Sequence, residues 1–492
     1  MDASQYMTPM RSALFPIYNH ELKRFIPSAL MVFFTILAFH LLRNSKDALV
    51  IYAPGSGAEV IPFLKLYVVL PASIIFSIFY MRLRKALEFE RTYYIIVSIF
   101  ISVFILFAYV LYPNSAYIHP DVETLQYYQD VYPRLRYFFA IWGAWSYALF
   151  YLTAELWGTY ALNVLFWQFA NDTTSSDEAQ RFFPLYVLSG NAALICLYPI
   201  VTHIQNNHLN DIYEVCGISS VSGVILMGIF WFLNNHTDVA VIRQKNRTRA
   251  LNGNKKKLTF FESLKVLSRS KYIGYVALLV LAYGMIINMV EVVWKAEVRI
   301  MYTDKEAYYG FIKHYILMTG IATIVMNYTS KGLIRKLGWK AGAMITPIVC
   351  GVLGSVFFIY VLNQNIMLEW FSFFKQTPLF LSVWLGALSV LLSKCSKYSF
   401  FDPTKEMAYI PLDIDLRTNG KAAVDGVGGR LGKSIGGFIV SGLLQVTSGT
   451  MIDIASYLSL VILIFTVLWL LSVFRLNDLY CDQVKQQRAT LA

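Results

Sequence analysis

Charged residues are scarce in this chain: Asp, Glu, Lys and Arg together make up only 15% of its 492 residues. Soluble domains usually carry about 25% charged residues, so this shortage excludes a soluble enzyme and a nucleic-acid-binding domain. The five cysteines are scattered, with no CxxC pair and no histidine at metal-ligand spacing. The cysteine pattern therefore excludes a disulfide-rich secreted scaffold, and we expect neither a metal site nor a cofactor.

Apolar residues are abundant instead, at 57% of the chain, and they recur in long runs separated by short polar breaks. A helix of about 20 apolar residues is long enough to cross the hydrocarbon core of a bilayer. We therefore predict an all-α membrane protein with twelve transmembrane helices. The predicted spans are 26–43, 60–80, 93–112, 137–168, 182–203, 216–233, 273–298, 313–330, 341–362, 379–400, 424–446 and 454–474.

Lysine and arginine are concentrated in alternate loops between these spans. The loops after the second and eighth spans and the long stretch 234–272 are rich in both, whereas 204–215 and 448–453 contain neither. Because positively charged loops tend to stay in the cytoplasm, this asymmetry predicts that both termini are cytoplasmic. The net charge of +12 is thus explained by topology and by attraction for anions, and we expect no nucleic-acid partner.

The basic stretch 234–272 divides the predicted spans six and six. Such a division is typical of carriers built from two parallel lobes, as in the major facilitator architecture. We predict an N-terminal six-helix lobe at 1–233, a cytoplasmic basic linker at 234–272 and a C-terminal six-helix lobe at 273–492. The basic turn 331–340 resembles the glycine-and-basic turn found at the same place in major facilitator carriers.

Several charged residues lie inside predicted spans, where a charge at the helix centre costs roughly 2.5–3.5 kcal/mol unless it faces a cavity or a partner. Arg43, Lys46 and Asp47 stand at the end of the first span, with Arg43 and Asp47 four residues apart on one helix face; snorkelling to the interface is the alternative explanation. Glu155 lies within the fourth span, and a satisfied structural carboxylate is the alternative there. Glu291 and Lys295 share one face of the seventh span, and an ion pair that only eases insertion is the alternative.

A further basic stretch runs from the tenth span into the eleventh, with Pro403 interrupting the helix. Its glycine-rich segment 425–434 invites comparison with a phosphate-binding P-loop, but Val427 stands where that motif needs glycine. We instead read these glycines as small residues that allow close helix contact. The cations expected to face a central cavity are Lys46, Lys295, Lys394, Lys397, Lys405, Arg430 and Lys433.

This set of cations favours a large anion over a sugar or a neutral amino acid. Charge-assisted bonds from Lys and Arg to phosphate oxygens offset the desolvation of both partners, so a polyphosphate suits the site. Nothing in these residues alone selects a nucleotide. We predict phosphate contacts from Lys46, Lys295, Lys405 and Arg430, gating charge pairs from Asp47, Glu155 and Glu291, and candidate stacking contacts to a base from Trp157 and Trp294.

Six segments carry a family resemblance that extends in order over nearly the whole chain. They are NSKDALVIYAPGSGAEVIPFLK (44–65), AELWG (154–158), FWQFAN (166–171), VEVVWK (290–295), FDPTKEMAYIPLD (401–413) and GGRLGKS (428–434). The chain resembles the ATP/ADP translocases of plastids and obligate intracellular bacteria. This resemblance implies a fold similar to that of major facilitator carriers, with functional charges at Lys46, Glu155, Glu291 and Lys405.

The resemblance implies an antiporter, not an enzyme, that exchanges host ATP for bacterial ADP across the inner membrane by alternating access. Its partners would be ATP, ADP and the lipid bilayer, and we expect it to function as a monomer. Two alternatives within transport stay open: a proton-coupled importer, and an exchanger of other nucleotides such as GTP, UTP, CTP or NAD. A membrane enzyme or nucleotide receptor is disfavoured by the failed P-loop pattern and by the lack of a magnesium-binding carboxylate cluster.

Overall fold

The computed structural model contains only helices as regular elements in the part of the chain that it describes. This confirms the predicted all-α class. The described residues are 15–174, 176–206, 211–239, 242, 270–364, 377–412, 420, 424 and 429–491. Most of the predicted linker, 234–272, therefore lies outside the described residues, and the exact lobe boundaries stay a prediction.

The first set of helices covers the predicted spans one to six. Several of these spans contain π-helical segments that interrupt the α-helix without ending it. The label η marks these π-helical segments and also the short 3₁₀ helices. The elements are η2 (Asn19–Glu21), α2 (Leu22–Ile51), α3 (Val60–Phe63), η3 (Leu64–Val69), α4 (Leu70–Ala86), α5 (Phe89–Leu106), η4 (Phe107–Leu111), α6 (Ser115–Ile118), α7 (Val122–Val131), η5 (Pro133–Leu135), α8 (Arg136–Gly143), α9 (Trp145–Trp157), η6 (Gly158–Phe166), α10 (Trp167–Thr173), α11 (Ser176–Asn206) and α12 (Asp211–His236); of the η segments, η2 and η5 are short 3₁₀ helices.

The second set covers the predicted spans seven to twelve. Polar caps start three of its helices: the Ser270 hydroxyl accepts from the Ile273 N–H at 3.4 Å, the Asp304 carboxylate from the Ala307 N–H at 2.8 Å, and the Thr377 hydroxyl from the Phe380 N–H at 3.2 Å. The elements are α15 (Lys271–Met301), α16 (Lys305–Leu362), α18 (Pro378–Ser396), η8 (Lys397–Phe401), α19 (Asp402–Tyr409), α21 (Gly429–Thr447) and α22 (Ala455–Leu491).

Ten helices among the described residues are long and apolar enough to cross a membrane. The two remaining predicted spans are helical as well, as α8 to α10 with η6 and as α21. Helices therefore stand at all twelve predicted positions. The structure also shows what the sequence did not predict: α6 and α7 form short helices in the loop between the third and fourth spans.

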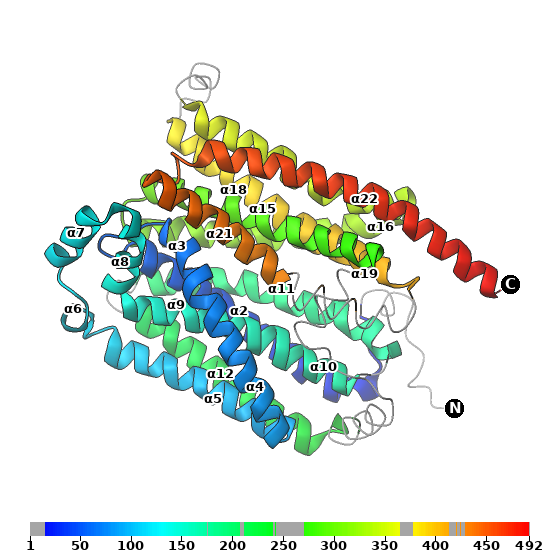
Figure 1. Cartoon of the computed structure of the whole chain (residues 1–492). Helices are drawn as coiled ribbons and strands as arrows, with labels where there is room; N and C mark the ends of the chain where they lie inside the picture. The colour runs from blue at the N-terminus through cyan, green and yellow to red at the C-terminus, as the bar shows by residue number, and fades with distance from the viewer. Residues whose placement is uncertain are drawn as a thin grey trace.

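The two sets of helices lie side by side along a common direction (Figure 1). The first set, drawn from blue to green, forms one half of the molecule, and the second set, drawn from green to red, forms the other. Helix α2 begins and helix α22 ends at the same end of the molecule, which we call the terminal end. The opposite end, which carries α6, α7 and the start of α8, we call the loop end.

Two glycines show why small residues are needed at particular points of the second set. Gly338 has φ +82° and separates α16 into its two spans, 305–330 and 336–362, a conformation that a residue with a Cβ adopts only under strain. Gly432 brings α21 against α15 so closely that a Cβ would lie 2.8 Å from the Leu281 carbonyl oxygen. This contact confirms that the glycine-rich segment serves close helix packing at Gly432.

Hydrogen bonds join the two sets of helices at the loop end. The Tyr137 hydroxyl donates to the Gly449 carbonyl at 2.8 Å, and the Gln205 amide donates to the Glu306 carbonyl at 3.0 Å. The Tyr52 hydroxyl, just past the end of α2, donates to the carbonyl of Tyr302. These contacts hold the loop end closed in this conformation.

Candidate functional site

Lys46 is withdrawn from solvent near the end of α2, with only 2% of its side chain exposed. Its ammonium lies 2.8 Å from Asp47 Oδ1 and 2.9 Å from Glu155 Oε1 on α9. The same ammonium lies 3.6 Å from the centre of the Tyr151 ring, at a distance typical of a cation–π contact. Snorkelling to the interface is therefore wrong for Lys46, because its charge is satisfied inside the protein.

Asp47 connects the two halves of the molecule. Its second oxygen, Oδ2, lies 2.7 Å from the Lys295 ammonium on α15, and both side chains are 6% exposed. Lys295 also reaches Glu291 Oε1, one turn earlier on the same helix, at 3.3 Å. The Glu291–Lys295 pair is thus more than an aid to insertion, since its lysine is shared with a carboxylate of the other half.

A single oxygen of Glu291 contacts cations from three helices. Besides Lys295, its Oε1 lies 2.9 Å from the Arg43 guanidinium on α2 and 3.3 Å from the Lys394 ammonium on α18. Each of these distances is short enough for a charge-assisted hydrogen bond or a close ion pair. One carboxylate therefore lies against three cations, so these four side chains together carry a net positive charge.

These seven side chains form one continuous ion-pair chain. It starts on α9, crosses α2 and α15 and ends on α18, so it runs from the first set of helices into the second. Charged side chains inside a membrane protein are tolerated only when they are paired or face a cavity. Here each of the seven has an ion-pair partner. In order, the members of the ion-pair chain are Glu155, Lys46, Asp47, Lys295, Glu291, Arg43 and Lys394.

Lys65 adds a further cation beside the ion-pair chain. It lies on the π-helical segment η3, and its ammonium donates to Asn288 Oδ1 on α15 at 2.6 Å. The Asn288 amide in turn donates to the Lys433 carbonyl at 3.4 Å, so both lysines stand beside α15, the helix that carries Glu291 and Lys295. Their side chains differ in exposure, since Lys65 is half-buried and Lys433 is exposed at the start of α21. π-Helical segments are frequent at functional sites, because they re-aim side chains within a helix.

Exposure divides the ion-pair chain into accessible and withdrawn members. Arg43 and Glu155 have 29% and 30% of their side chains exposed, whereas Lys46 has 2% and Lys295 has 6%. Arg43 and Glu155 are therefore the members of the ion-pair chain that a ligand can reach most easily in this conformation. Lys46 and Lys295, in contrast, are almost fully buried.

Lys405, one of the predicted phosphate ligands, is not a member of the ion-pair chain. Lys405 is on α19 at the terminal end (Figure 1), where its ammonium lies 3.5 Å from Glu406 Oε1. Arg430 is at the start of α21, but its side chain lies outside the described residues. Lys397, also predicted to face the cavity, lies 2.7 Å from Asp402. Of the predicted residues, the structure thus brings together Lys46, Asp47, Glu155, Glu291, Lys295 and Lys394.

The two predicted base contacts are enclosed by other side chains in this conformation. Trp157 is fully buried against Phe100, and its indole N–H donates to the Thr35 carbonyl at 3.3 Å. Trp294 is 1% exposed, and its indole N–H donates to the Val383 carbonyl at 3.0 Å. Both rings pack between helices here, so a stacking role for either stays a prediction.

Sequence reasoning underrates three members of this site. Arg43 stands at the end of an apolar run, and its partner Glu291 lies 248 residues away in sequence. Lys65 and Asn288 lie inside the predicted spans 60–80 and 273–298, but neither is singled out, because the partner of each lies on a distant helix. A search for cations four residues from a carboxylate finds Lys295 beside Glu291 and Arg43 beside Asp47, but it cannot find pairs formed between distant helices, such as Arg43 with Glu291.

Comparisons with known proteins agree with this architecture. A family model described as TLC ATP/ADP transporter matches residues 1–480. The chain is 38% identical to "ADP,ATP carrier protein 1" of Rickettsia prowazekii, with 97% of each chain covered, and 37% identical to "ADP,ATP carrier protein 3" of Rickettsia conorii, with 98% and 99% covered.

Solved structures extend the likeness at the level of fold. A mutant form of the nucleoside transporter NupG superposes with a TM-score of 0.54 at 12% identity, covering 92% of this chain and 99% of that one. A bacterial homologue of the iron transporter ferroportin gives 0.54 at 13% identity, covering 96% and 99%. The protein thus has a major-facilitator-like fold and crosses the membrane many times, and by its match to the family model and its identity to the rickettsial carriers it belongs to the TLC ATP/ADP transporter family.

Proposed function

We propose that this protein exchanges ATP for ADP across the inner membrane of a bacterium by alternating access, with both termini in the cytoplasm. The names of its relatives support ATP and ADP as substrates. The single observation that carries the proposal is the ion-pair chain, because it places more cations than carboxylates inside a membrane protein. We further propose that the unit of transport is the monomer and that the nucleotide is moved without being hydrolysed.

The charge balance of the site supports a polyphosphate substrate. The ion-pair chain holds four cations against three carboxylates, and Lys65 and Lys433 stand nearby. Together these are six cations and three carboxylates. A nucleotide di- or triphosphate supplies several negative charges in one molecule, so it offsets this surplus better than a monovalent anion does.

Binding is proposed to begin at the accessible cations. Arg43 and Lys394 share Glu291 Oε1 with Lys295, so an incoming phosphate competes with one carboxylate oxygen for three partners. Guanidinium and ammonium groups bind phosphate oxygens at least as well as they bind a carboxylate. We propose that Lys405 and Arg430 guide the phosphates from the terminal end, and that Lys46 and Lys295 bind them once the ion-pair chain rearranges.

The same pairs that hold the cations also hold the two halves together. Asp47–Lys295 and Arg43–Glu291 each join α2 to α15. When phosphates bind these cations, the ion pairs between α2 and α15 weaken, and the lobes 1–233 and 273–492 can rock about the site. An empty carrier keeps its ties and reorients slowly, so transport in one direction requires return transport of another nucleotide.

A proton-coupled importer is the rival mechanism. It would require Glu155 or Glu291 to give up its cations when it takes up a proton. Protonation of Glu291 would take the ion-pair partner from Arg43 and Lys394, and an unpaired charge inside the membrane is costly. If phosphate groups replace the carboxylates as partners of the same cations, all of these cations stay paired, which favours the exchange mechanism.

Transport into proteoliposomes tests the proposal. Vesicles loaded with ADP should take up labelled ATP much faster than empty vesicles, and a protonophore should leave the uptake intact. Unlabelled GTP, UTP, CTP and NAD, added one at a time, should compete poorly. Fast uptake into empty vesicles that a protonophore abolishes would establish the proton-coupled importer instead, and strong competition by another nucleotide would change the substrate assignment.

A further inference from the structure

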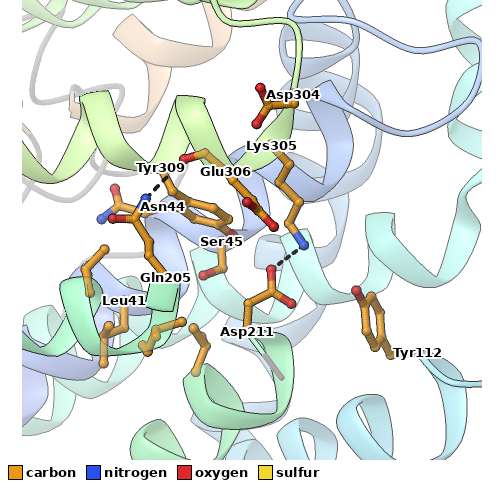
Figure 2. A pocket seen from close by; sticks show the side chains of 13 residues that line it. Leu41, Asn44, Ser45, Tyr112, Gln205, Asp211, Asp304, Lys305, Glu306 and Tyr309 are labelled. Carbon is orange, nitrogen blue, oxygen red and sulfur yellow. Dashed lines mark hydrogen bonds and ion pairs between the residues drawn. The ribbon is translucent and has the colours of Figure 1, made fainter. Parts of the chain in front are cut away.

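A cavity of about 490 Å³ lies at the loop end, between α2, α11, α12 and the start of α16. Figure 2 shows that its lining residues come from both sets of helices. Asn44 and Ser45 of α2 line this cavity, next in sequence to Lys46, which turns to the ion-pair chain. The two sites therefore lie against different sides of the same helix turn.

The cavity already accommodates one ammonium group. The Lys305 ammonium forms an ion pair with Asp211 and lies 6.0 Å and 5.8 Å from the ring centres of Tyr112 and Tyr309. A cation beside a carboxylate and between two aromatic rings is the arrangement by which proteins recognise organic ammonium ions. Here a lysine of the protein itself occupies the position of that ligand.

The charges and the shape of the cavity select the same kind of ligand. Asp304 and Glu306 also line it, so its lining includes three carboxylates and one lysine. Its remaining walls are largely apolar and include Leu41 and Ile204. This charge balance is opposite to that of the ion-pair chain, so a nucleotide is disfavoured and a cation with an apolar body is favoured.

Tyr309 supplies an independent sign that a ligand is accommodated. Its side chain is buried and its hydroxyl faces Ser45, yet among the described residues no group meets this hydroxyl with hydrogen-bond geometry. Buried hydroxyl groups normally have a partner. Since Tyr309 lines the cavity (Figure 2), a molecule bound there can complete its hydrogen bonding.

We propose that this cavity is a binding site for a small organic ammonium ion with an apolar body. Its volume lies within the range of small-molecule sites, about 300–1,000 Å³. The bound cation replaces the Lys305 ammonium between Tyr112, Tyr309 and Asp211. Because α12 and α16 belong to different halves, a ligand that contacts both keeps the loop end closed and thereby inhibits reorientation.

Binding to the purified full-length protein in detergent tests this proposal directly. The probe is hexylammonium, whose N–H groups can donate to the Tyr309 hydroxyl, and the controls are hexanol and hexanesulfonate, which share its chain but are neutral and anionic. Saturable binding by calorimetry and a rise in melting temperature are expected for the ammonium probe alone. Equal effects from hexanol or hexanesulfonate would overturn the proposal. The readout needs no transport, so its outcome is separate from that of the proposed exchange function.

Substitution of Lys305 distinguishes ligand binding in the cavity from a purely structural role of this lysine. Lys305→Met vacates the position between the tyrosines and leaves Asp211 without its lysine partner, so affinity for the probe should rise about tenfold. Lys313→Met is the matched control, because Lys313 lies further along α16, near the Tyr198 ring, and its removal should leave affinity unchanged.

Asp211→Asn provides the opposite test and covers a Lys305 variant that fails to fold. Loss of this carboxylate should weaken the probe about tenfold, whereas Asp130→Asn, on the exposed face of α7, should not. Unchanged affinity in either Lys305→Met or Asp211→Asn would show that the ammonium does not bind in this cavity.

Discussion

The Asp47–Lys295 pair permits a quantitative test of how the two halves are joined. Its atoms lie 2.7 Å apart and both side chains are 6% exposed, so at an effective dielectric constant of 20 the Coulomb attraction is about 6 kcal/mol. Most of this attraction is offset by the desolvation of both charges. Asp47 keeps Lys46 as a partner and Lys295 keeps Glu291, so either single substitution leaves the remaining charge only partly compensated.

We expect Asp47→Asn and Lys295→Met each to lower the free energy of unfolding by about 3 kcal/mol, the lower end of the cost of breaking a buried pair. The double variant should lose about 4 kcal/mol, which corresponds to a coupling energy of about 2 kcal/mol. The measurement is unfolding in mixed micelles of detergent and dodecyl sulfate, followed by tryptophan fluorescence. Additive effects, within about 0.5 kcal/mol, would refute a direct tie between α2 and α15.

Three further predictions concern transport and packing. Lys46→Ala and Lys405→Ala should each lower ATP exchange about tenfold or more, through loss of a charge-assisted bond to phosphate, whereas Lys85→Ala at an exposed position should not; normal exchange by both variants would contradict the phosphate assignment. Gly432→Val should destabilise the protein by about 1–3 kcal/mol, because the α15 backbone leaves no room for a side chain. Gly338→Ala should cost about 1–2 kcal/mol through its positive φ alone, since open space surrounds it; unchanged unfolding free energies would contradict both packing arguments.

The spans and several charged residues of the site could be predicted from the sequence because the membrane restricts what a sequence can do. An apolar run of sufficient length must form a helix in a bilayer, and this rule located helices at all twelve predicted positions. A charge inside such a helix must find a partner, and this rule singled out Lys46, Glu155 and Glu291. The structure gives each of these three a partner within 3.3 Å.

The identity of the partners could not be predicted, because it depends on how distant helices are placed. Lys295 is expected from spacing to pair with Glu291 on its own helix, but its shorter contact is with Asp47 of the other half. Lys65 and Asn288 meet across 223 residues of sequence, and no periodicity within one helix signals such a contact. Trp157 and Trp294 stand beside the two glutamates in sequence, yet both rings turn into the helix packing.

The Lys305 cavity shows the same limit more strongly. Asp211 and Lys305 each stand at the start of a helix, where charged residues are common and carry little information. Only the ion pair between the starts of α12 and α16 brings them together, with Tyr112 and Tyr309, in one cavity. Sequence patterns therefore predicted the charges that the membrane must satisfy, and missed those at the ends of helices.

The proposed exchange mechanism requires that carboxylates hold the cations of the site until phosphates replace them. Glu155 offers the cleanest test, because it is 30% exposed and its partner Lys46 keeps Asp47 as a second partner. The decisive measurement is the affinity of purified Glu155→Gln protein for ATP, by calorimetry, beside its exchange rate in vesicles. We predict tighter ATP binding with slower exchange, since a competitor for Lys46 is lost; weaker or unchanged binding would contradict this mechanism.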